Sequence, residues 1–372
     1  MPGREVFGEE ERAQIAEVME QGVLFRYGFD AQRAGVFKVA EFEKKFASYL
    51  GCSYALGVSS GSAALKVALE SSDLPKGSAI LTSSFTFVAS IEAIEESGYV
   101  PVLCEADASY NISVEDMERQ YSPQVSAVLP VHMMGSSCDM EGILQFAQLK
   151  NLVVIEDACQ ATGATYKGKY LGSLGAFGCF SFDYAKILTT GEGGMVVTSD
   201  QSLYLKSDRY HDHGHSHRTD LARGFEPREG KGFNYRMSEL QGALGIAQLA
   251  KLPSIISGQK KNKKILKDIL AAYPFITIRK QYDEEGEIAT FLVFSLPDMK
   301  TAETFKARLK DNNVPTGVMN YWHFIANKES VGKPEEFLAT KDLLDRTVFI
   351  EILLKMDIVS IAAGLKKVCD SF

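Results

Sequence analysis

Residues 79–157 decide the fold of this chain: they read AILTS at 79–83, VPVLCE at 100–105, SAVLPVH at 126–132 and LVVIED at 152–157. Each stretch is short and apolar on both faces, and helical patterns such as DMEGILQFAQLK (139–150) lie between them. This alternation is typical of a mostly parallel sheet covered by helices on both sides. With three further strands near 55–59, 177–182 and 194–198, we expect an α/β fold with a large seven-stranded sheet.

The sequence pattern changes towards the C-terminus. A helix over SELQGALGIAQLAKL (238–252), continued by a basic helix to about residue 272, is expected to connect two domains. Beyond it, FLVFSLP (291–297) predicts a strand, AETFKARLKDN (302–312) a helix and VPTGV (314–318) another strand, which together indicate a small α+β domain. We therefore expect an N-terminal segment and large domain over residues 1–250 and a small domain over residues 251–372.

Composition excludes several classes of protein. The chain has 372 residues and a formal net charge of −8, and its basic residues are not clustered, so nucleic acid is not an expected partner. The charged, amphipathic start and the lack of a long apolar run predict neither a signal peptide nor a membrane span. Six scattered cysteines without a C-x-x-C pair are typical of reduced thiols, and we expect a cytoplasmic protein.

A lysine and an aspartate carry the strongest chemical signal. Lys186 lies in SFDYAKILTTGEGG (181–194), between two predicted strands, and Asp157 ends an earlier apolar strand. A lysine that forms a Schiff base and a carboxylate that keeps a pyridine nitrogen protonated describe a site for pyridoxal 5′-phosphate (PLP). Taken singly, a lysine is more often a solvated surface group, and an aspartate after a strand more often caps a helix.

Other candidate cofactor contacts surround this pair. SSGSAALKVALE (59–70) places Gly61 and Ser62 at a strand-to-helix turn, where free N–H groups bind phosphate, and Ser181 is a third candidate. Phe87 would stack on the cofactor ring, and Gln160 would contact its 3′-oxygen. An ordinary capped helix start is the alternative for SSGSAALKVALE, and a core phenylalanine is the alternative for Phe87.

Six motifs in order resemble the DegT/StrS family of PLP-dependent sugar aminotransferases. They are VSSGSAAL, TSSFTFVAS, PVHMMGSSCDM, IEDACQATGATYKGKYLGSLG, SFDYAKILTTGEGGMVVT and GFNYRMSELQGALGIAQL, and the resemblance covers roughly residues 1–330. It implies the fold type I architecture of aspartate aminotransferase. It also implies a homodimer with active sites shared between the subunits.

The resemblance also implies roles for individual residues. Lys186 corresponds to the Schiff-base lysine and Asp157 to the partner of the pyridine nitrogen. The remaining cofactor contacts fall on Gln160, Phe87, Gly61, Ser62, Ser181 and, reaching the neighbouring subunit's phosphate, Asn234. NYWHF resembles the family's substrate segment and points to Tyr321 and His323.

The expected reaction moves an amino group from glutamate or glutamine to a keto or aldehydo sugar. MPGREVFG…VLFRYGFD and YHDHGHSH most resemble enzymes that make 8-amino-3,8-dideoxy-manno-octulosonate, so an 8-oxo sugar acid related to Kdo is the expected acceptor. A nucleotide sugar is the alternative. Lys186 argues against the family's dehydratases, which have histidine there. A lyase or desulfurase of the same fold and a non-catalytic PLP-binding sensor are the other readings.

Four of the six histidines, His211, His213, His215 and His217, lie in HDHGHSH. Alternating histidines on a strand can bind a metal. The family usually has a D-H-G loop there that needs none, and we expect a polar loop and no metal. Arg26 and Tyr27, in the early GVLFRYG turn, are candidate contacts for an acidic substrate, with a structural role in the loop as the alternative.

Overall fold

The computed structural model describes residues 2–218, 220–221, 223–317 and 321–372. Its main sheet has seven strands in the order β1-β9-β8-β5-β4-β2-β3. They are β1 (Tyr54–Val58), β2 (Ala79–Ser83), β3 (Val100–Cys104), β4 (Val125–Leu129), β5 (Val153–Asp157), β8 (Phe177–Ser181) and β9 (Gly194–Thr198). Neighbouring strands from β3 to β8 pair in parallel, and β9 is antiparallel to both of its neighbours. The expected α/β fold with seven mostly parallel strands is confirmed.

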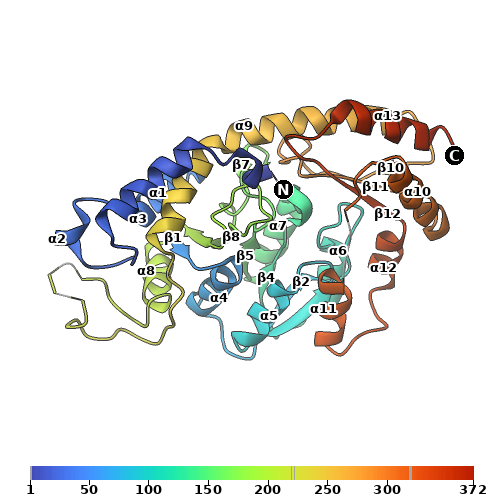
Figure 1. Cartoon of the computed structure of the whole chain (residues 1–372). Coiled ribbons are helices and arrows are strands. Elements are labelled where there is room, and N and C mark those ends of the chain that lie inside the picture. Colours follow the sequence, from blue (N-terminus) through green and yellow to red (C-terminus); the bar gives the residue numbers. More distant parts are fainter. Residues whose placement is uncertain (1, 219, 222, 318–320) are drawn as a thin grey trace.

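The strands of this sheet contribute side chains to two separate hydrophobic cores. Ile80 belongs to one core and the adjacent Leu81 to the other, and Ile155 and Val154 divide in the same way. Helices cover both faces of the sheet (Figure 1). They are α3 (Lys38–Leu50), α4 (Gly61–Ser71), α5 (Ala89–Glu96), α6 (Val114–Gln120), α7 (Met140–Lys150) and α8 (Gln201–Tyr210). Burial on both faces explains why these strands are apolar throughout.

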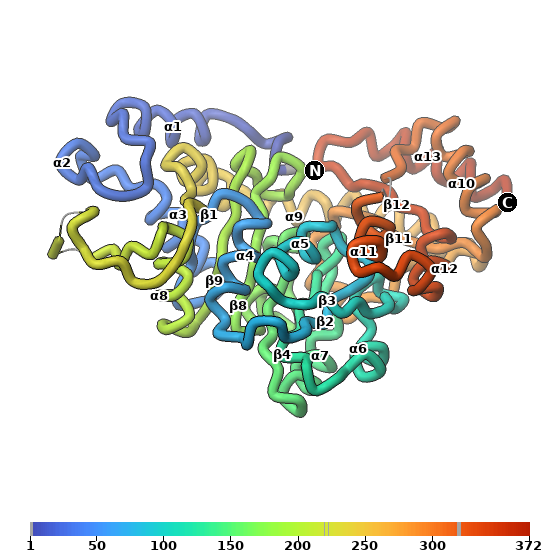
Figure 2. Tube along the Cα trace, turned by 90° about the horizontal axis from the view of Figure 1, so that it is seen from below, coloured from blue at the N-terminus to red at the C-terminus, as the bar shows by residue number. Residues whose placement is uncertain are grey.

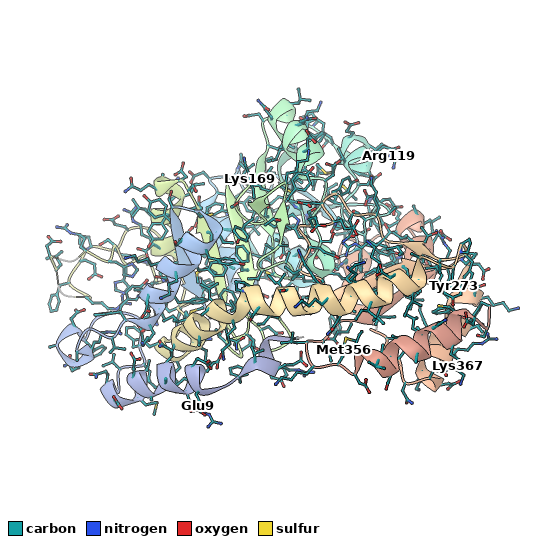
Figure 3. The ribbon with its side chains drawn as sticks, turned by 90° about the horizontal axis from the view of Figure 1, so that it is seen from above. Glu9, Arg119, Lys169, Tyr273, Met356 and Lys367 are labelled. Atoms are coloured by element: carbon teal, nitrogen blue, oxygen red, sulfur yellow. The ribbon has the colours of Figure 1, made fainter. Side chains whose placement is uncertain are left out.

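One long helix, α9 (Glu239–Leu270), connects the two parts of the molecule. Two successive helices were predicted here; the structure has a single helix of 32 residues that continues through Pro253. Figure 3, a view from above, shows this helix running along the molecule. Ser238 and Gln241 form a capping box at its start. The domain boundary expected at residue 250 falls inside this helix.

The C-terminal part has its own sheet and its own core. β10 (Thr277–Ile278), β11 (Phe291–Ser295) and β12 (Thr347–Glu351) form an antiparallel sheet, and α10 (Met299–Asp311) and α13 (Ile358–Cys369) share its core. The strand predicted at 314–318 is absent over residues 314–317, and residue 318 lies outside the described residues. Val314 packs into the core instead, and Gly317 N–H bonds to Phe349 O (2.7 Å).

Short elements join these parts. They are η1 (Pro2–Val6), α1 (Glu9–Gln21), α2 (Asp30–Arg33), η2 (Met133–Gly135), β6 (Thr165–Tyr166), β7 (Lys169–Tyr170), η3 (Tyr321–His323), α11 (Ile325–Ser330) and α12 (Leu338–Asp345). The predicted N-terminal helix is α1, and Glu11 ties it to Lys251 of α9. Figure 2 places α11 and α12 beside α5 and β3. Within the described ranges, no helix has both the length and the apolar character needed to cross a bilayer.

Candidate active site

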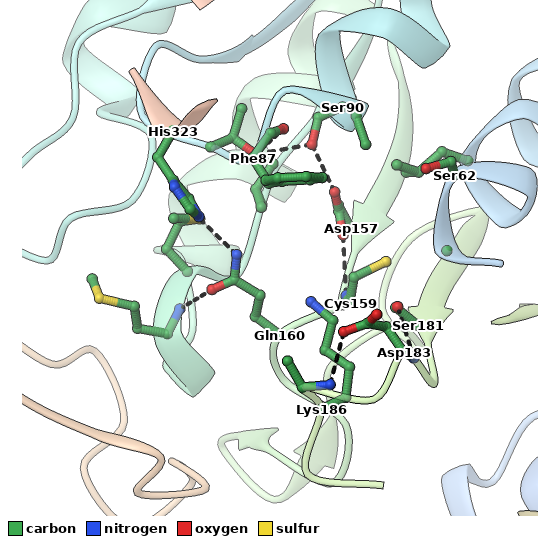
Figure 4. Close-up of a pocket in the computed structure, with 18 of the residues that line it drawn as sticks. Ser62, Phe87, Ser90, Asp157, Cys159, Gln160, Ser181, Asp183, Lys186 and His323 are labelled. Carbon is green, nitrogen blue, oxygen red and sulfur yellow. Dashed lines mark hydrogen bonds between the residues drawn. The ribbon is translucent and has the colours of Figure 1, made fainter. Parts of the chain in front are cut away.

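Eight predicted site residues line one cavity of about 440 Å³. They are Gly61, Ser62, Phe87, Asp157, Gln160, Ser181, Lys186 and His323, and Figure 4 labels all of them except Gly61. The cavity lies where β5 and β8 end and α4 and α5 begin, which is where open α/β sheets bind ligands. Segments far apart in the sequence thus meet at one edge of the sheet.

Asp157, the last residue of β5, is buried, and its carboxylate faces the cavity. Ser90 Oγ donates to Oδ2 (2.8 Å) and the N–H of Cys159 donates to Oδ1 (3.0 Å). Both donors are neutral, and no ion pair joins Asp157 to a cation among the residues that the structure describes. The carboxylate is therefore held rigidly while its negative charge stays available to a cationic ligand atom.

Ser90 is a site residue that the sequence did not single out. It stands at the end of TSSFTFVAS, a run with several hydroxyl groups, and nothing in the run marks this one. Its neighbour in space, Asp157, comes from a strand more than sixty positions later. The adjacent Glu156 points elsewhere and accepts N–H groups of Gly172, Leu174 and Gly175, so it has a structural role.

Lys186 lies in the loop between β8 and β9, the two strands expected around it. Its N–H bonds to Asp183 O (2.9 Å), and Asp183 Oδ1 accepts from Ala185 N–H (2.8 Å). Thr190 N–H donates to Phe182 O (2.9 Å), and this hydrogen bond closes the loop. These main-chain bonds hold the half-buried lysine at the cavity wall, near Asp183 in Figure 4.

The start of α4 forms the candidate phosphate site. Ser60 is the N-cap and accepts from Ala63 N–H (3.0 Å), so Ser62 Oγ is not the cap, and this exposed side chain lines the cavity. A Cβ on Gly61 would lie 2.7 Å from Ser181 Cβ and 3.1 Å from Cys159 Sγ. Glycine is therefore required where the helix start meets β8. The helix start presents free N–H groups beside two hydroxyl groups, a donor set that fits a phosphate.

Phe87 and His323 lie next to each other at the cavity mouth. Their ring centroids are 5.6 Å apart at 57°. Thr86 N–H bonds to His323 O (3.0 Å), and Asn327 Nδ2 donates to Thr86 O (2.8 Å). Burial, followed by the charge of Lys186, lowers the pKa of His323 below its ordinary value. A neutral imidazole and an exposed aromatic face are thus presented to a ligand.

Four predicted residues lie outside the cavity of their own chain. Tyr321 is exposed and bonds to Glu329. Arg26 Nη2 pairs with Glu43 Oε2 (2.5 Å), and Tyr27 OH bonds to His211 Nε2 (2.8 Å). Asn234 is exposed in the loop that precedes α9. A single subunit therefore does not bring these four side chains to Lys186.

The histidine run forms a cluster of ion pairs. His217 lies between Asp208 Oδ2 (2.7 Å) and Asp212 Oδ2 (2.8 Å), and its ring stacks on Tyr27 at 4.0 Å. Although burial opposes it, these two carboxylates raise the pKa of His217 to about 9. His215 pairs with Glu226 (2.7 Å). Among the described residues, no group of three or more His, Cys, Asp or Glu could hold a metal ion.

The donor set of the cavity fits PLP. A phosphate matches the start of α4 with Ser62 and Ser181, and a protonated ring nitrogen matches the carboxylate of Asp157, which has only neutral donors within the described chain. Gln160 offers an amide donor to the 3′-oxygen, Phe87 an aromatic face and Lys186 an amine. The cavity therefore offers a group of complementary chemistry for each of these parts of PLP.

A family model described as "DegT/DnrJ/EryC1/StrS aminotransferase family" matches residues 7–368. A protein of Caulobacter vibrioides named GDP-perosamine synthase is 38% identical over 229 residues, which are 60% of this chain and 59% of that protein. The spore coat polysaccharide biosynthesis protein SpsC of Bacillus subtilis is 34% identical over 333 residues, 86% of this chain and 82% of its own.

Among solved structures, an aminotransferase from Psychrobacter cryohalolentis superimposes with a TM-score of 0.89 at 28% sequence identity. The superposition covers 98% of each chain. The likeness therefore extends over the large sheet, α9 and the C-terminal three-stranded sheet together.

Proposed function

Because this chain belongs to the DegT/DnrJ/EryC1/StrS aminotransferase family and is a PLP-dependent sugar aminotransferase, we propose that Lys186 and Asp157 carry its chemistry. The observation that supports this is their meeting in one cavity with the candidate phosphate site at α4. Bound PLP supplies an electron-withdrawing ring that stabilises negative charge at the carbon next to the transferred nitrogen.

The residues around the cofactor have distinct tasks in this proposal. Asp157, fixed by Ser90 and Cys159 N–H, keeps the proton on the ring nitrogen. Lys186 Nζ removes the proton from the donor's α-carbon as a base and returns a proton as an acid. Phe87 covers one face of the ring, and His323 lies beside it at the mouth where the substrate enters.

For the acceptor we propose an 8-oxo-3,8-dideoxy-manno-octulosonate, a Kdo-type sugar acid. The early VLFRYGFD turn and the YHDHGHSH segment support it, and in the fold these two segments pack together through Tyr27 and His211. A nucleotide-linked keto-deoxyhexose is the second candidate, because a relative is named GDP-perosamine synthase. Both acceptors require the same transfer of an amino group to a carbonyl carbon.

We further propose a homodimer in which Asn234 reaches the phosphate in the partner's cavity. Asn234 is exposed. Both Asn234 and Arg26 lie outside the cavity of their own chain. Mixing Lys186→Ala subunits with Asn234→Ala subunits tests this. Shared sites predict that mixed dimers regain activity, because one of the two sites then has both residues intact. If the mixture stays as inactive as the separate variants, Asn234 does not act across subunits.

The deciding experiment follows the visible absorption of the PLP-loaded protein during titration with L-glutamate and, separately, L-glutamine. Loss of the PLP band, with pyridoxamine phosphate identified by chromatography, would establish the first half of the transfer and name the donor. The converted enzyme is then offered the Kdo-type acceptor and the nucleotide-linked keto sugar. If no amino donor converts the cofactor, the protein is better described as a PLP-binding sensor.

A further inference from the structure

The side-chain amide of Gln160 has a fixed orientation. Its Oε1 accepts the main-chain N–H of Met134 (3.0 Å), and a main-chain nitrogen can only donate. Nε2 is therefore on the opposite side, where its one contact within the described chain is the weak acceptor Sδ of Met133 (3.5 Å). In Figure 4 Gln160 lies between His323 and Lys186. The remaining N–H of the amide is free to donate to a ligand.

The turn that fixes Gln160 is strained. Met134 has a φ of 54°, a left-handed conformation that costs a non-glycine residue about 1 kcal/mol. Gly135 follows with a φ of 77°. Two successive left-handed residues persist only where the surroundings hold them. The orientation of Gln160 thus depends on whatever holds this turn.

Three hydrogen bonds from the small-domain segment 279–290 hold the turn. Arg279 Nη2 donates to Met133 O (2.8 Å), Thr290 Oγ1 to Met134 O (3.3 Å) and Ile288 N–H to Gly135 O (3.1 Å). Three successive carbonyls are therefore bound by a segment that lies far away in the sequence. The packing is tight as well, since a Cβ on Gly135 would lie 2.5 Å from Ile288 Cγ1.

Arg279 is unusual because it is buried and its hydrogen bonds go to main-chain carbonyls. Nε donates to Ser109 O (2.8 Å) in addition to the bond to Met133 O. It makes no ion pair within 4 Å among the described residues. Burial lowers the pKa of Arg279 to about 10. A buried cation without a carboxylate partner is costly, which suggests a role beyond packing.

We infer that Arg279 and Thr290 are positioning residues of the active site, holding the Met133–Gly135 turn so that Gln160 Nε2 donates to the 3′-oxygen of PLP. The inference rests on the proposed function, specifically on the contact of Gln160 with the cofactor. Through this turn the small domain sets a hydrogen bond in a site built mainly from the large domain. Neither residue touches the cavity itself.

The consequence is spectroscopic. A hydrogen-bond donor at the 3′-oxygen stabilises the anionic form of this oxygen. The proton that this oxygen shares is therefore released at a lower pH. Losing a hydrogen bond to a charged group corresponds to a shift of about one pH unit. The other charged or titratable side chains of the cavity are the same in every variant: Asp157, Cys159, Asp183, Lys186, Glu192 and His323.

The test is a pH titration of the visible band of PLP bound to the full-length protein. Gln160→Leu and Arg279→Met are each expected to raise the midpoint by about one pH unit, and Thr290→Val by a smaller amount in the same direction. The double variant Gln160→Leu/Arg279→Met should show no further shift, because both changes remove the same hydrogen bond, from Gln160 Nε2 to the 3′-oxygen. Thr198→Val is the matched control: Thr198 is also buried and donates to a carbonyl, Ala176 O, away from the cavity.

The possible outcomes distinguish the positioning role of Arg279 and Thr290 from the proposed PLP-dependent function. A shift in Gln160→Leu with wild-type midpoints in Arg279→Met and Thr290→Val would overturn the positioning role alone. A wild-type midpoint in Gln160→Leu would remove the 3′-oxygen contact and the inference with it. Absence of any PLP band in the wild-type protein would count against the proposed function. If Arg279→Met does not fold, the comparison of Thr290→Val with Thr198→Val decides.

Discussion

Two buried aspartates, Asp157 and Asp212, differ in what surrounds their charge. Asp157 accepts hydrogen bonds from a hydroxyl and a main-chain N–H, both neutral. Asp212 is bound by three basic side chains: His217 (2.8 Å), Arg223 (2.7 Å) and Arg236 (2.5 Å). The carboxylate of Asp212 is paired with basic side chains of its own chain, whereas the carboxylate of Asp157 has only neutral donors among the described residues.

The difference distinguishes a structural cluster from the proposed chemical site. The cluster around Asp212 joins the loop after α8 to Tyr27 and, through a backbone bridge, to Asn234. In the cavity, the polar groups are held in place but retain capacity to bind. We therefore expect changes at the cavity to affect turnover, and changes at the Asp212 cluster to affect stability.

The largest effect on turnover is expected from Lys186→Ala. Removing the amine should lower the rate of amino transfer by at least about 10⁴-fold, because no other base occupies its position. The variant should still bind PLP through the other contacts, which equilibrium dialysis measures. Activity near that of the wild type would contradict the assignment, and Lys76→Ala, at an exposed lysine, serves as the control.

Asp157→Asn should have the next largest effect. An amide no longer favours a protonated ring nitrogen, and we expect the rate of proton transfer to fall by about 10²- to 10³-fold. The melting temperature should change by only a few degrees, because the amide retains hydrogen-bonding capacity. A rate within a fewfold of the wild type would show that Asp157 does not act on the ring nitrogen.

Asp212→Asn should show the opposite pattern. It leaves His217, Arg223 and Arg236 without their shared carboxylate, and removing one partner of buried ion pairs typically costs about 3 kcal/mol. Denaturant unfolding of Asp212→Asn and Asp157→Asn side by side measures this difference. Equal losses of stability in the two variants would remove the distinction between the two aspartates.

The smallest expected effect is a pH dependence of stability due to His217. Its pKa is raised from 6.5 to about 9 in the folded chain. The folded state therefore binds the proton more tightly, and the stabilisation is complete below pH 6.5 and is lost as pH rises towards 9. We expect the unfolding free energy to fall by about 2 kcal/mol across this range in the wild type and by less in His217→Gln. Identical pH profiles would show that His217 contributes nothing.

Some features were only partly predictable. The pattern of α9 indicated two helices, but packing against α1, α3 and α13 supports one helix through Pro253. The residues at 314–317 resemble a strand, yet Val314 is used by the small core and no strand forms there. Ser90 and Arg279 carry no local signal, because their partners lie far away in the sequence.

The sequence by itself determined the sheet and the large core, and it predicted that Lys186 and Asp157 share one site. These follow from the period of apolar residues and from residue types with a specific chemistry, both of which are local properties. Only the tertiary structure decided which carboxylate is paired with basic side chains, which hydroxyl holds Asp157 and how segment 279–290 holds the turn beside Gln160. Such contacts depend on distances between remote segments, which a linear pattern does not contain.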